Sequence, residues 1–444
     1  MKISRRQFVI AGTLLTVAAP LWLASQEAPA PNVPGGRPPE QGPEGPTFHE
    51  RVTWMKNPST EAVLSWTTRT PGKDHRVYYD TESRGGKLDA YAQKQATFKD
   101  GQYNFVQADE QYAKPGYYHH VHLTNLKPNT TYHVVFASDD KASREFHFRT
   151  APADDADFMI LAGGDSRLGK ETPTVHVDRR KMNERMAKLF ADEANNITCL
   201  VHGGDYCMTA QWRHIERWLT DHELTTTPAG RLLPIVPTRG NHDSAVGFEE
   251  MFAYPTLDTP YYYSTQLSSR VGLITLNTEI SVAGDQRDWL KAELPPMREK
   301  NRWLFAIYHR PAFSSVRDVQ DGAGRRGNWV PLFEQNNIDI AYESHDHALK
   351  RTVPIRSSAI DPKNGIVYFG DGGLGVPQRK PDTNRWWLQP PGMAQSAHHV
   401  HTIKFTKDQM RVQAIGMEGE VLDDFTAKPR DLAALAAEAA KMKI

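Results

Sequence analysis

Five short polar groups, each placed after an apolar run, hold the side chains of this chain that are best suited to chemistry. The runs over 158–162 and 197–201 each lead through a pair of glycines to a carboxylate, Asp165 and Asp205. Later runs lead to the other groups, which are Asn241, His242 and Asp243, then His309, then His345 and His347. Because ligands bind outside the carboxyl ends of the strands in an α/β sheet, we expect these side chains to face one site.

The residue types point to a pair of metal ions. Two aspartates, one asparagine and three histidines are ligands that borderline divalent metals and ferric iron accept. Adjacent strands lie about 4.8 Å apart, so Asp165 and Asp205 can approach the same point. One carboxylate can then bridge two ions about 3.5–4 Å apart, the spacing used for displacement at phosphate esters. A single Gly-Asp pair or a lone histidine is usually structural, but five such groups in order predict a two-metal centre.

The elements around these groups alternate between strand and helix. Apolar runs of the kind buried on both faces recur at 158–162, 197–201, 235–238, 271–276, 303–308, 338–342 and 366–369. Stretches with helical periodicity lie between them, and the alternation predicts an α/β domain over 155–420. Short β-forming runs separated by turns predict a small β-sandwich over 48–150. The alanine-rich residues 428–444 predict a C-terminal helix.

Two further segments have less specific patterns. Residues 117–122 contain three histidines, which suits a metal site, but His120 and His122 alternate with Val121. That alternation favours a strand with its histidines on the outer face. Residues 370–375 match the glycine spacing of a dinucleotide loop, yet prolines follow closely and exclude the helix that such a loop requires. A strand-ending turn near the site is the expectation for this segment.

The N-terminus indicates export. Arg5 and Arg6 precede a short apolar run that ends near Leu23, the pattern of a twin-arginine signal over 1–30. A linker rich in proline and glycine follows over 31–47. The apolar run is too short for a membrane span, so none is expected after cleavage. The implied partner is the twin-arginine export machinery, and the expected location is the periplasm or the exterior of a bacterium.

Bulk composition adds two constraints. Lys plus Arg and Asp plus Glu are equal at 53 each, so no global charge favours nucleic acid, and no nucleic-acid binding is expected. The only cysteines are Cys199 and Cys207. Along an extended strand they lie too far apart for a disulfide, so both are expected to be free thiols.

Together, the five groups resemble the sequence blocks of the calcineurin-like binuclear metallophosphoesterases, and among these the purple acid phosphatases. The family blocks GDxG, GDxxY, GNH[ED], xxxH and GHxH stand here as GDSR from 164, GDYCM from 204, GNHD from 240, AIYH from 306 and SHDH from 344. The resemblance covers nearly all of the mature chain. It implies a fibronectin type III-like β-sandwich followed by a metallophosphoesterase domain, an α/β fold of the αββα sandwich type.

The resemblance also implies a role for each residue, with two metal ions as cofactors: Fe with Zn, Mn or a second Fe. The ligands would be Asp205 with Asn241, His309 and His345 at one site, and Asp205 with Asp165 and His347 at the other. A metal-activated hydroxide would attack phosphorus in line. His242 would contact the phosphate or protonate the leaving alkoxide, and Asp243 would orient it.

Three positions depart from the family pattern. Met208 replaces the tyrosine whose phenolate binds ferric iron and gives the family its colour, so the GDxxY block is degenerate. Arg167 stands where many non-purple relatives place a metal-binding histidine, and it either clamps the substrate phosphate or pairs with a neighbouring acid. Ser344 replaces a glycine, which we expect to be tolerated. Tyr206 is the only nearby phenol, and its position two residues before 208 turns its side chain elsewhere.

These features predict an exported, metal-dependent phosphatase that hydrolyses small phosphate esters, with phosphomonoesters as the first choice. The metal core does not decide between classes of ester, so a phosphodiesterase acting on nucleotides or lipid head groups is the alternative. A reading from another class is a relative that binds phosphate or metal without turnover. The intact ligand set favours an enzyme over that reading, while the thinned Asp165 site keeps it open.

Overall fold

The computed structural model describes residues 46–104, 114–167 and 173–435, apart from the side chains of 173–176. The predicted signal over 1–30, the linker up to residue 45 and the predicted helix beyond residue 435 lie outside the described residues. Of the residues predicted to form this helix, 432–435 are helical and 428–431 are not. Among the described helices, none combines the length and the apolar character needed to cross a membrane.

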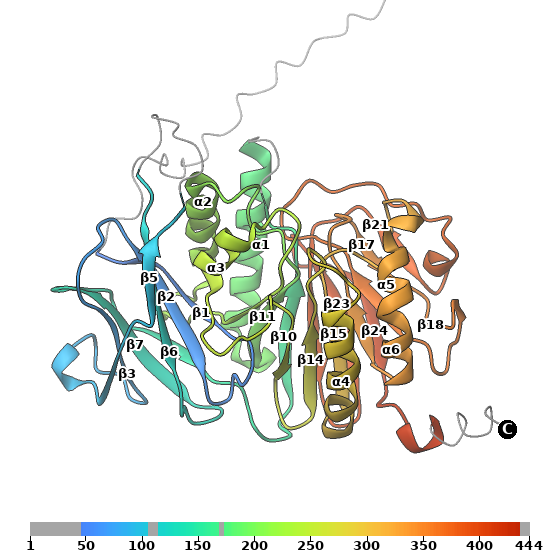
Figure 1. Ribbon diagram of the computed structural model, residues 1–444, viewed down its shortest axis with the longest axis horizontal. Helices are drawn as coiled ribbons and strands as arrows, with labels where there is room; N and C mark the ends of the chain where they lie inside the picture. Colours follow the sequence, from blue (N-terminus) through green and yellow to red (C-terminus); the bar gives the residue numbers. More distant parts are fainter. Residues whose placement is uncertain (1–45, 105–113, 168–172, 436–444) are drawn as a thin grey trace, which may run out of the picture. The chain divides into compact units, whose positions relative to one another are not determined.

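The first hundred described residues form two facing layers of strands (Figure 1). One layer contains β1 (Phe48–Thr53), β2 (Ala62–Thr68), β5 (Lys99–Gln102) and β6 (Tyr117–Leu123). The other contains β3 (His75–Asp80), β4 (Gln93–Ala96), β7 (Thr131–Ser138), β8 (Lys141–Ala142) and β9 (Phe146–Arg149). Trp66 and Phe136, both fully buried, pack between the layers with ring centroids 5.5 Å apart. The predicted β-sandwich is confirmed, because residues on the facing strands point inward and share one core.

The rest of the chain adds strands to two large sheets. The first sheet gains β10 (Phe158–Gly163), β11 (Ile197–His202), β12 (Ile235–Pro237), β22 (His399–Phe405), β23 (Met410–Gly416) and β24 (Val421–Ala427). The second contains β13 (Tyr263–Gln266), β14 (Val271–Thr275), β15 (Trp303–Ile307), β16 (Ile340–Tyr342), β17 (Leu349–Arg351), β20 (Val367–Gly370) and β21 (Met393–Gln395). A short hairpin, β18 (Ile355–Arg356) and β19 (Ala359–Ile360), stands apart from both sheets.

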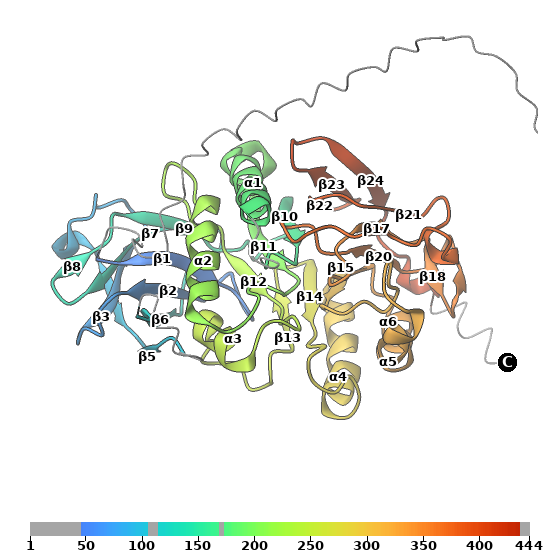
Figure 2. The same cartoon turned by 90° about the horizontal axis from the view of Figure 1, so that it is seen from above.

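Helices cover the outer faces of these two sheets, as Figure 2 shows from above. Helix α1 (Pro173–Ala191) packs Met182, Met186 and Phe190 against the first sheet. The helices α4 (Asp285–Lys300), α5 (Ala323–Asn328) and α6 (Val330–Gln335) lie beside the second sheet. Between the sheets lies one core that joins apolar side chains of β10, β11 and β22 to those of β14, β15 and β16. This order of layers confirms the αββα sandwich.

One sheet runs through both predicted domains. Thr53 of β1 pairs in parallel with Ile235 of β12, so the strands of the sandwich layer continue those of the α/β region in one ten-stranded sheet. At the other end, β24 pairs with β23 and extends this sheet beyond residue 420. The predicted domain boundaries at 150, 155 and 420 do not coincide with the edges of the sheets. They therefore stay predictions.

The prediction that His120 lies on an outer face was wrong. The side chain of His120 is fully buried, because α3 (Ala245–Phe252) packs over this face of β6. Its ring nitrogens lie 2.7 Å from Ser65 Oγ and 3.1 Å from Glu250 O. His119 faces the sandwich core and stacks on His75, with all four ring nitrogens of this pair within hydrogen-bond distance of protein groups. This histidine-rich segment is therefore a structural strand in which His119 and His120 are buried and the partly exposed His122 pairs with Glu61.

The core between the two sheets can be tested at Phe405. Its buried ring lies 5.5 Å from the ring of Phe158 in the same sheet and 5.7 Å from that of Phe305 in the facing sheet. We expect Phe405→Ala to lower the free energy of unfolding by about 3–5 kcal/mol, because it leaves a cavity at this contact. Urea denaturation measures the loss.

The matched control is Phe98→Ala, since Phe98 is 40% exposed. We expect this variant to change the free energy of unfolding by less than about 1 kcal/mol. Equal stability of the two variants would show that Phe405 does not link the sheets.

Candidate metal centre

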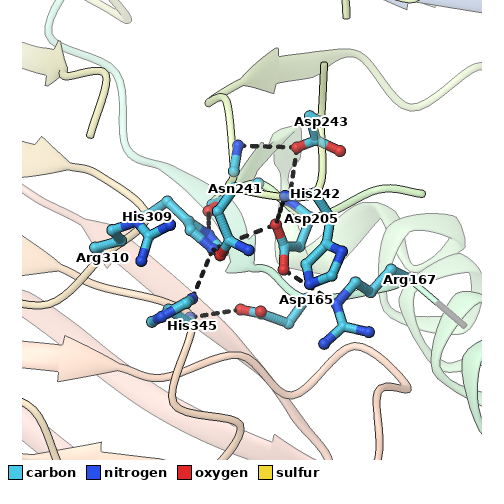
Figure 3. Close-up of polar contacts among 12 residues, drawn as sticks. Asp165, Arg167, Asp205, Asn241, His242, Asp243, His309, Arg310 and His345 are labelled. Atoms are coloured by element: carbon cyan, nitrogen blue, oxygen red, sulfur yellow. Dashed lines mark hydrogen bonds and ion pairs between the residues drawn. The ribbon is translucent and has the colours of Figure 1, made fainter. Parts of the chain in front are cut away.

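The ends of five strands, taken from both sheets, meet at the predicted site. From the first sheet, Asp165 follows β10, Asp205 follows β11 and Asn241 follows β12; from the second, His309 follows β15, and His345 and His347 follow β16. Figure 3 shows His309, His345 and Asn241 directed toward the two aspartates. Strands β10 and β11 are neighbours, with Gly163 opposite His202, as the closeness of Asp165 and Asp205 required. The structure thus brings all six predicted ligands together.

Four of these six residues have left-handed backbone conformations. The φ angles are 56° at Asp165, 59° at Asp205, 80° at His345 and 59° at His347. Such values are uncommon for residues other than glycine and occur where the surrounding structure imposes them. Each turn directs the chain sharply at a strand end, so that the side chain faces the site.

The first group of donor atoms surrounds His309. Its Nε2 lies 3.0 Å from Asn241 Oδ1, 3.1 Å from His345 Nδ1 and 3.3 Å from Asp205 Oδ1. Asp205, His309 and His345 each offer one ligand atom within 4.8 Å of the others. Two imidazoles, one amide oxygen and one carboxylate oxygen form a donor set that fits Zn, Mn or Fe.

The second group is smaller and has free donor atoms. Asp165 Oδ1 and His347 Nε2 lie 3.2 Å apart, and apart from this contact neither atom has a hydrogen-bond partner within the described residues. Both side chains are almost completely buried, and Asp205 supplies a third ligand atom within 4.8 Å. Buried donors without partners are unfavourable unless a cation completes them, so this group also fits a metal ion.

Main-chain oxygens orient two of the imidazoles. His309 Nδ1 lies 2.9 Å from Gly203 O, and His347 Nδ1 lies 3.3 Å from Pro377 O. Because a carbonyl oxygen only accepts, each ring has a proton on Nδ1, and Nε2 is the atom directed at the site. The lone pair of Nε2 would be the one offered to a metal ion.

The electrostatics of the site agree with these roles. Burial by itself would raise the pKa of Asp165, but His309 and His347 lower that pKa to about 2, and the carboxylate stays ionised. Burial, followed by the charge of His309, lowers the pKa of His345 and favours its neutral imidazole. Burial by itself would lower the pKa of His309, but Asp205 and Asp165 raise it. A cation bound here would take over this positive charge, because a metal-binding histidine must be deprotonated.

Two family models match the chain over this region. The model for the purple acid phosphatase N-terminal domain matches residues 48–150, and the calcineurin-like phosphoesterase model matches residues 138–349, which include the whole site. The chain is a purple acid phosphatase-like metallophosphoesterase. It is accordingly a metal-dependent phosphoric ester hydrolase, of a family whose metal centre is typically binuclear.

Several known proteins are similar to this metallophosphoesterase. An uncharacterised protein of Mycobacterium tuberculosis is 27% identical, over 87% of this chain and 81% of that protein. Purple acid phosphatase 18 of Arabidopsis thaliana is 25% identical, over 76% of this chain and 72% of that protein. A purple acid phosphatase from yellow lupin seeds has the same fold, with a TM-score of 0.73 at 19% identity over 88% of this chain and 76% of that one.

Asp243 does not orient His242 in this metallophosphoesterase, and that expectation was wrong. Its buried carboxylate instead accepts hydrogen bonds from the main-chain nitrogens of Asp205 at 2.8 Å, Tyr206 at 3.0 Å and Gly240 at 2.8 Å. His242 is held by Met208, whose main-chain oxygen lies 3.0 Å from Nδ1. Asp243 therefore positions the loop that carries Asp205, because only a compact acceptor can serve these three amides at once.

Arg167 pairs with an acid, and that acid is the predicted bridging ligand. Its Nε donates to Asp205 Oδ2 at 3.1 Å, and its Nη1 lies 3.1 Å from Met208 Sδ. Figure 3 shows Arg167 on the side of Asp205 opposite His309. The guanidinium thus fills the space beside residue 208, and a fixed positive charge stands next to the Asp165 group.

The other departures have simple structural reasons. The Tyr206 ring stacks on His202 in the core, and burial raises the pKa of its hydroxyl, so it supplies no phenolate to the site. Ser344 is buried with its Oγ against two glycines, and a Cβ at Gly203 would lie 2.1 Å from that oxygen. The serine is accommodated because its neighbours have no side chains. Cys207, like Cys199, is a buried free thiol, as predicted.

The predicted turn after β20 lies at the site, where Gly372 closes against Asp165 so tightly that a Cβ there would lie 2.2 Å from Oδ2. Sequence patterns missed two arginines beside it. Arg317 and Arg379 each contact His345 O, and neither was singled out. Both lie in loops after strand ends, which is the only sequence signal, and arginines in loops are too common to be distinguished by it.

The positioning role of Asp243 can be tested by removing its carboxylate. We expect Asp243→Ala to lower the free energy of unfolding by about 3 kcal/mol, because three buried N–H groups lose their acceptor. The metal content of the purified variant should also fall, because the Asp243 carboxylate no longer holds the loop that carries Asp205. Urea denaturation and elemental analysis measure the two effects.

Asp192→Ala is the control for this test. Asp192 is exposed, and its carboxylate accepts one hydrogen bond, from Ala194 N at 3.0 Å. If Asp243→Ala keeps the metal content and stability of this control variant, the Asp205 loop does not depend on Asp243.

The colour of the iron-loaded protein tests the absence of a phenolate. We expect no tyrosinate-to-iron charge-transfer band, because residue 208 is methionine and Tyr206 is turned into the core. Met208→Tyr should introduce the band, and visible absorption detects it. A purple wild-type preparation that loses its colour in Tyr206→Phe would contradict the placement of Tyr206.

Proposed function

We propose that this metallophosphoesterase is an exported phosphatase that acts on small phosphomonoesters at a centre of two metal ions. Asp205 would bridge the ions, with Asn241, His309 and His345 completing one site and Asp165 and His347 the other. The observation that carries the proposal is the convergence of these donors: three of them surround His309 Nε2, and the partnerless atoms of Asp165 and His347 face each other.

When bound, the two ions would lower the pKa of a water molecule and offset the charge of the phosphoryl oxygens. The residues of the chain would position the substrate around them. His242, fixed through Nδ1 by Met208 O, would use Nε2 to contact the phosphate or, when protonated, to give a proton to the leaving alkoxide. Arg167 would add a fixed positive charge on the other side of Asp205.

Names of the relatives support phosphatase activity and a mixed metal pair. Arabidopsis thaliana Fe(3+)-Zn(2+) purple acid phosphatase 12 is 22% identical, over 74% of this chain and 73% of that protein. Iron with zinc, manganese or a second iron is therefore the proposed pair. Because Met208 offers no phenolate, the ion at the Asp165 site would have fewer anionic ligands and would be held more weakly.

Export is the second part of the proposal. Arg5 and Arg6 before a short apolar run support the twin-arginine machinery as a partner and the periplasm or exterior as the location. A route for folded proteins suits this centre, because ligands from five strand ends come together only after folding.

A structure of PhoD shares the fold, with a TM-score of 0.64 at 11% identity over 88% of this chain and 92% of that one.

Substitution of ligands in the metal-loaded protein tests the proposed chemistry. We expect Asn241→Ala and His309→Ala to reduce hydrolysis of p-nitrophenyl phosphate to the level of a metal-free sample, while the melting curve stays cooperative. The reason is that each substitution removes a donor from the group around His309 Nε2. Elemental analysis of the same samples should show loss of one metal ion per chain.

His133→Ala is the matched control, since this histidine lies in the sandwich and pairs with Glu145. Near-normal turnover in Asn241→Ala or His309→Ala would contradict the mechanism. Faster hydrolysis of bis(p-nitrophenyl) phosphate than of the monoester would favour the phosphodiesterase alternative. Metal-loaded wild-type protein without turnover of either substrate would favour a non-catalytic binding protein.

A further inference from the structure

Two arginines from different loops converge on one oxygen beside the metal ligands. Arg317 Nη2 and Arg379 Nη1 each lie 3.4 Å from His345 O. Arg317 belongs to the loop after β15, and Arg379 belongs to the loop after β20. Both side chains are partly exposed, so the two guanidinium groups can reach a bound molecule.

Their positive charge is only partly neutralised. Arg317 Nε lies 3.6 Å from Asp346 Oδ1, but the other oxygen of Asp346 already accepts hydrogen bonds from the 314–316 loop. Within the described residues, Arg379 has no carboxylate at ion-pair distance. By contrast, Arg310 is neutralised by Glu279, which accepts from Nε at 2.9 Å and from Nη2 at 3.2 Å. The excess charge is therefore local to Arg317 and Arg379.

The two guanidinium groups bring like charges to one oxygen at the edge of the site. Such a cluster is unfavourable by itself and becomes favourable when an anion binds.

Hydrogen bonds hold both loops at fixed places. Arg379 N donates to His347 O at 2.8 Å, and Arg317 N donates to Ser314 Oγ at 2.8 Å. Arg385 joins the two loops, because its guanidinium donates to Ser314 O and Arg317 O, each at 2.5 Å. The two cationic side chains therefore start from rigid positions, which lowers the entropy lost on binding.

The two guanidinium groups lie beside the metal ligands rather than among them. Both contact the main-chain oxygen of His345, whereas Nδ1 of this residue faces His309 in the ligand group. A phosphoryl group that reacts at the metal ions would therefore be distinct from a group held by Arg317 and Arg379. The fork of donors on arginine matches phosphate oxygens in a bidentate way.

We propose that Arg317 and Arg379 form a subsite for a second phosphate group on the substrate. The preferred substrates would be small phosphomonoesters that carry two phosphates, such as a sugar bisphosphate. This inference rests on the proposed phosphatase function and specifies the class of substrate that the same site would prefer.

The ratio of two rates in the metal-loaded protein tests the subsite. We expect wild-type kcat/KM to be about 10- to 100-fold higher for fructose 1,6-bisphosphate than for fructose 6-phosphate, the range expected for charge-assisted hydrogen bonds. Arg379→Gln and Arg317→Gln should each lower this ratio about 10-fold. Rising salt should lower the ratio in wild-type protein, because the contacts are ionic.

Lys380→Gln is the control, since Lys380 is exposed and adjacent to Arg379, and it should keep the wild-type ratio. A wild-type ratio near one, or a ratio that Arg379→Gln leaves unchanged, would overturn the subsite. An equal fall in kcat/KM for both substrates in Arg379→Gln would also overturn the subsite, because Arg379 would then hold the reacting phosphate.

A binding measurement separates failure of this inference from failure of the proposed function. By calorimetry on the metal-loaded protein, we expect Arg379→Gln to weaken binding of hexane-1,6-diphosphonate, which has a six-carbon spacer, about 10-fold more than it weakens binding of inorganic phosphate. This result would support the subsite even if the wild-type protein hydrolysed neither sugar phosphate. Equal weakening of both ligands would reject the subsite whatever the turnover.

Discussion

The site depends on the buried carboxylate of Asp205 and on the donors that surround it. One carboxylate oxygen accepts a hydrogen bond from His242 N at 2.9 Å and lies 3.3 Å from His309 Nε2. The other oxygen accepts a hydrogen bond from Arg167 Nε at 3.1 Å. A buried negative charge is stable only where donors and cations are held around it. Strands from two sheets, left-handed turns and the acceptor side chain of Asp243 all serve to hold these groups in place.

The strand ends that hold these groups around Asp205 have unusual backbone conformations. Residues with side chains adopt the left-handed conformation at Asp165, Asp205, His345 and His347, which is locally unfavourable. Glycines permit the close contacts between these turns, as at Gly372 beside Asp165. The apolar core between the sheets and the helix layers outside them stabilise the strands firmly enough to keep the turns in place.

The replacement of the family tyrosine changes the character of the centre. Met208 and Arg167 lie together, so an uncharged thioether and a guanidinium occupy the neighbourhood in which a phenolate would stand. Positive charge is thereby added where the family pattern supplies negative charge. The two candidate donor groups are therefore unequal, with the amide of Asn241 added to the group around His309 and a smaller group at Asp165.

The sequence alone determined the β-sandwich, an α/β domain and the convergence of six polar side chains, because apolar runs followed by polar groups report strand ends directly. The αββα arrangement came from the resemblance to the family. The sequence could not determine the burial of His120, since a helix distant in sequence covers that face. Nor could it assign Asp243 to three amides or bring Arg317 and Arg379 to one oxygen. These relations join loops far apart in the chain, and only the packing of two sheets decides which loops meet.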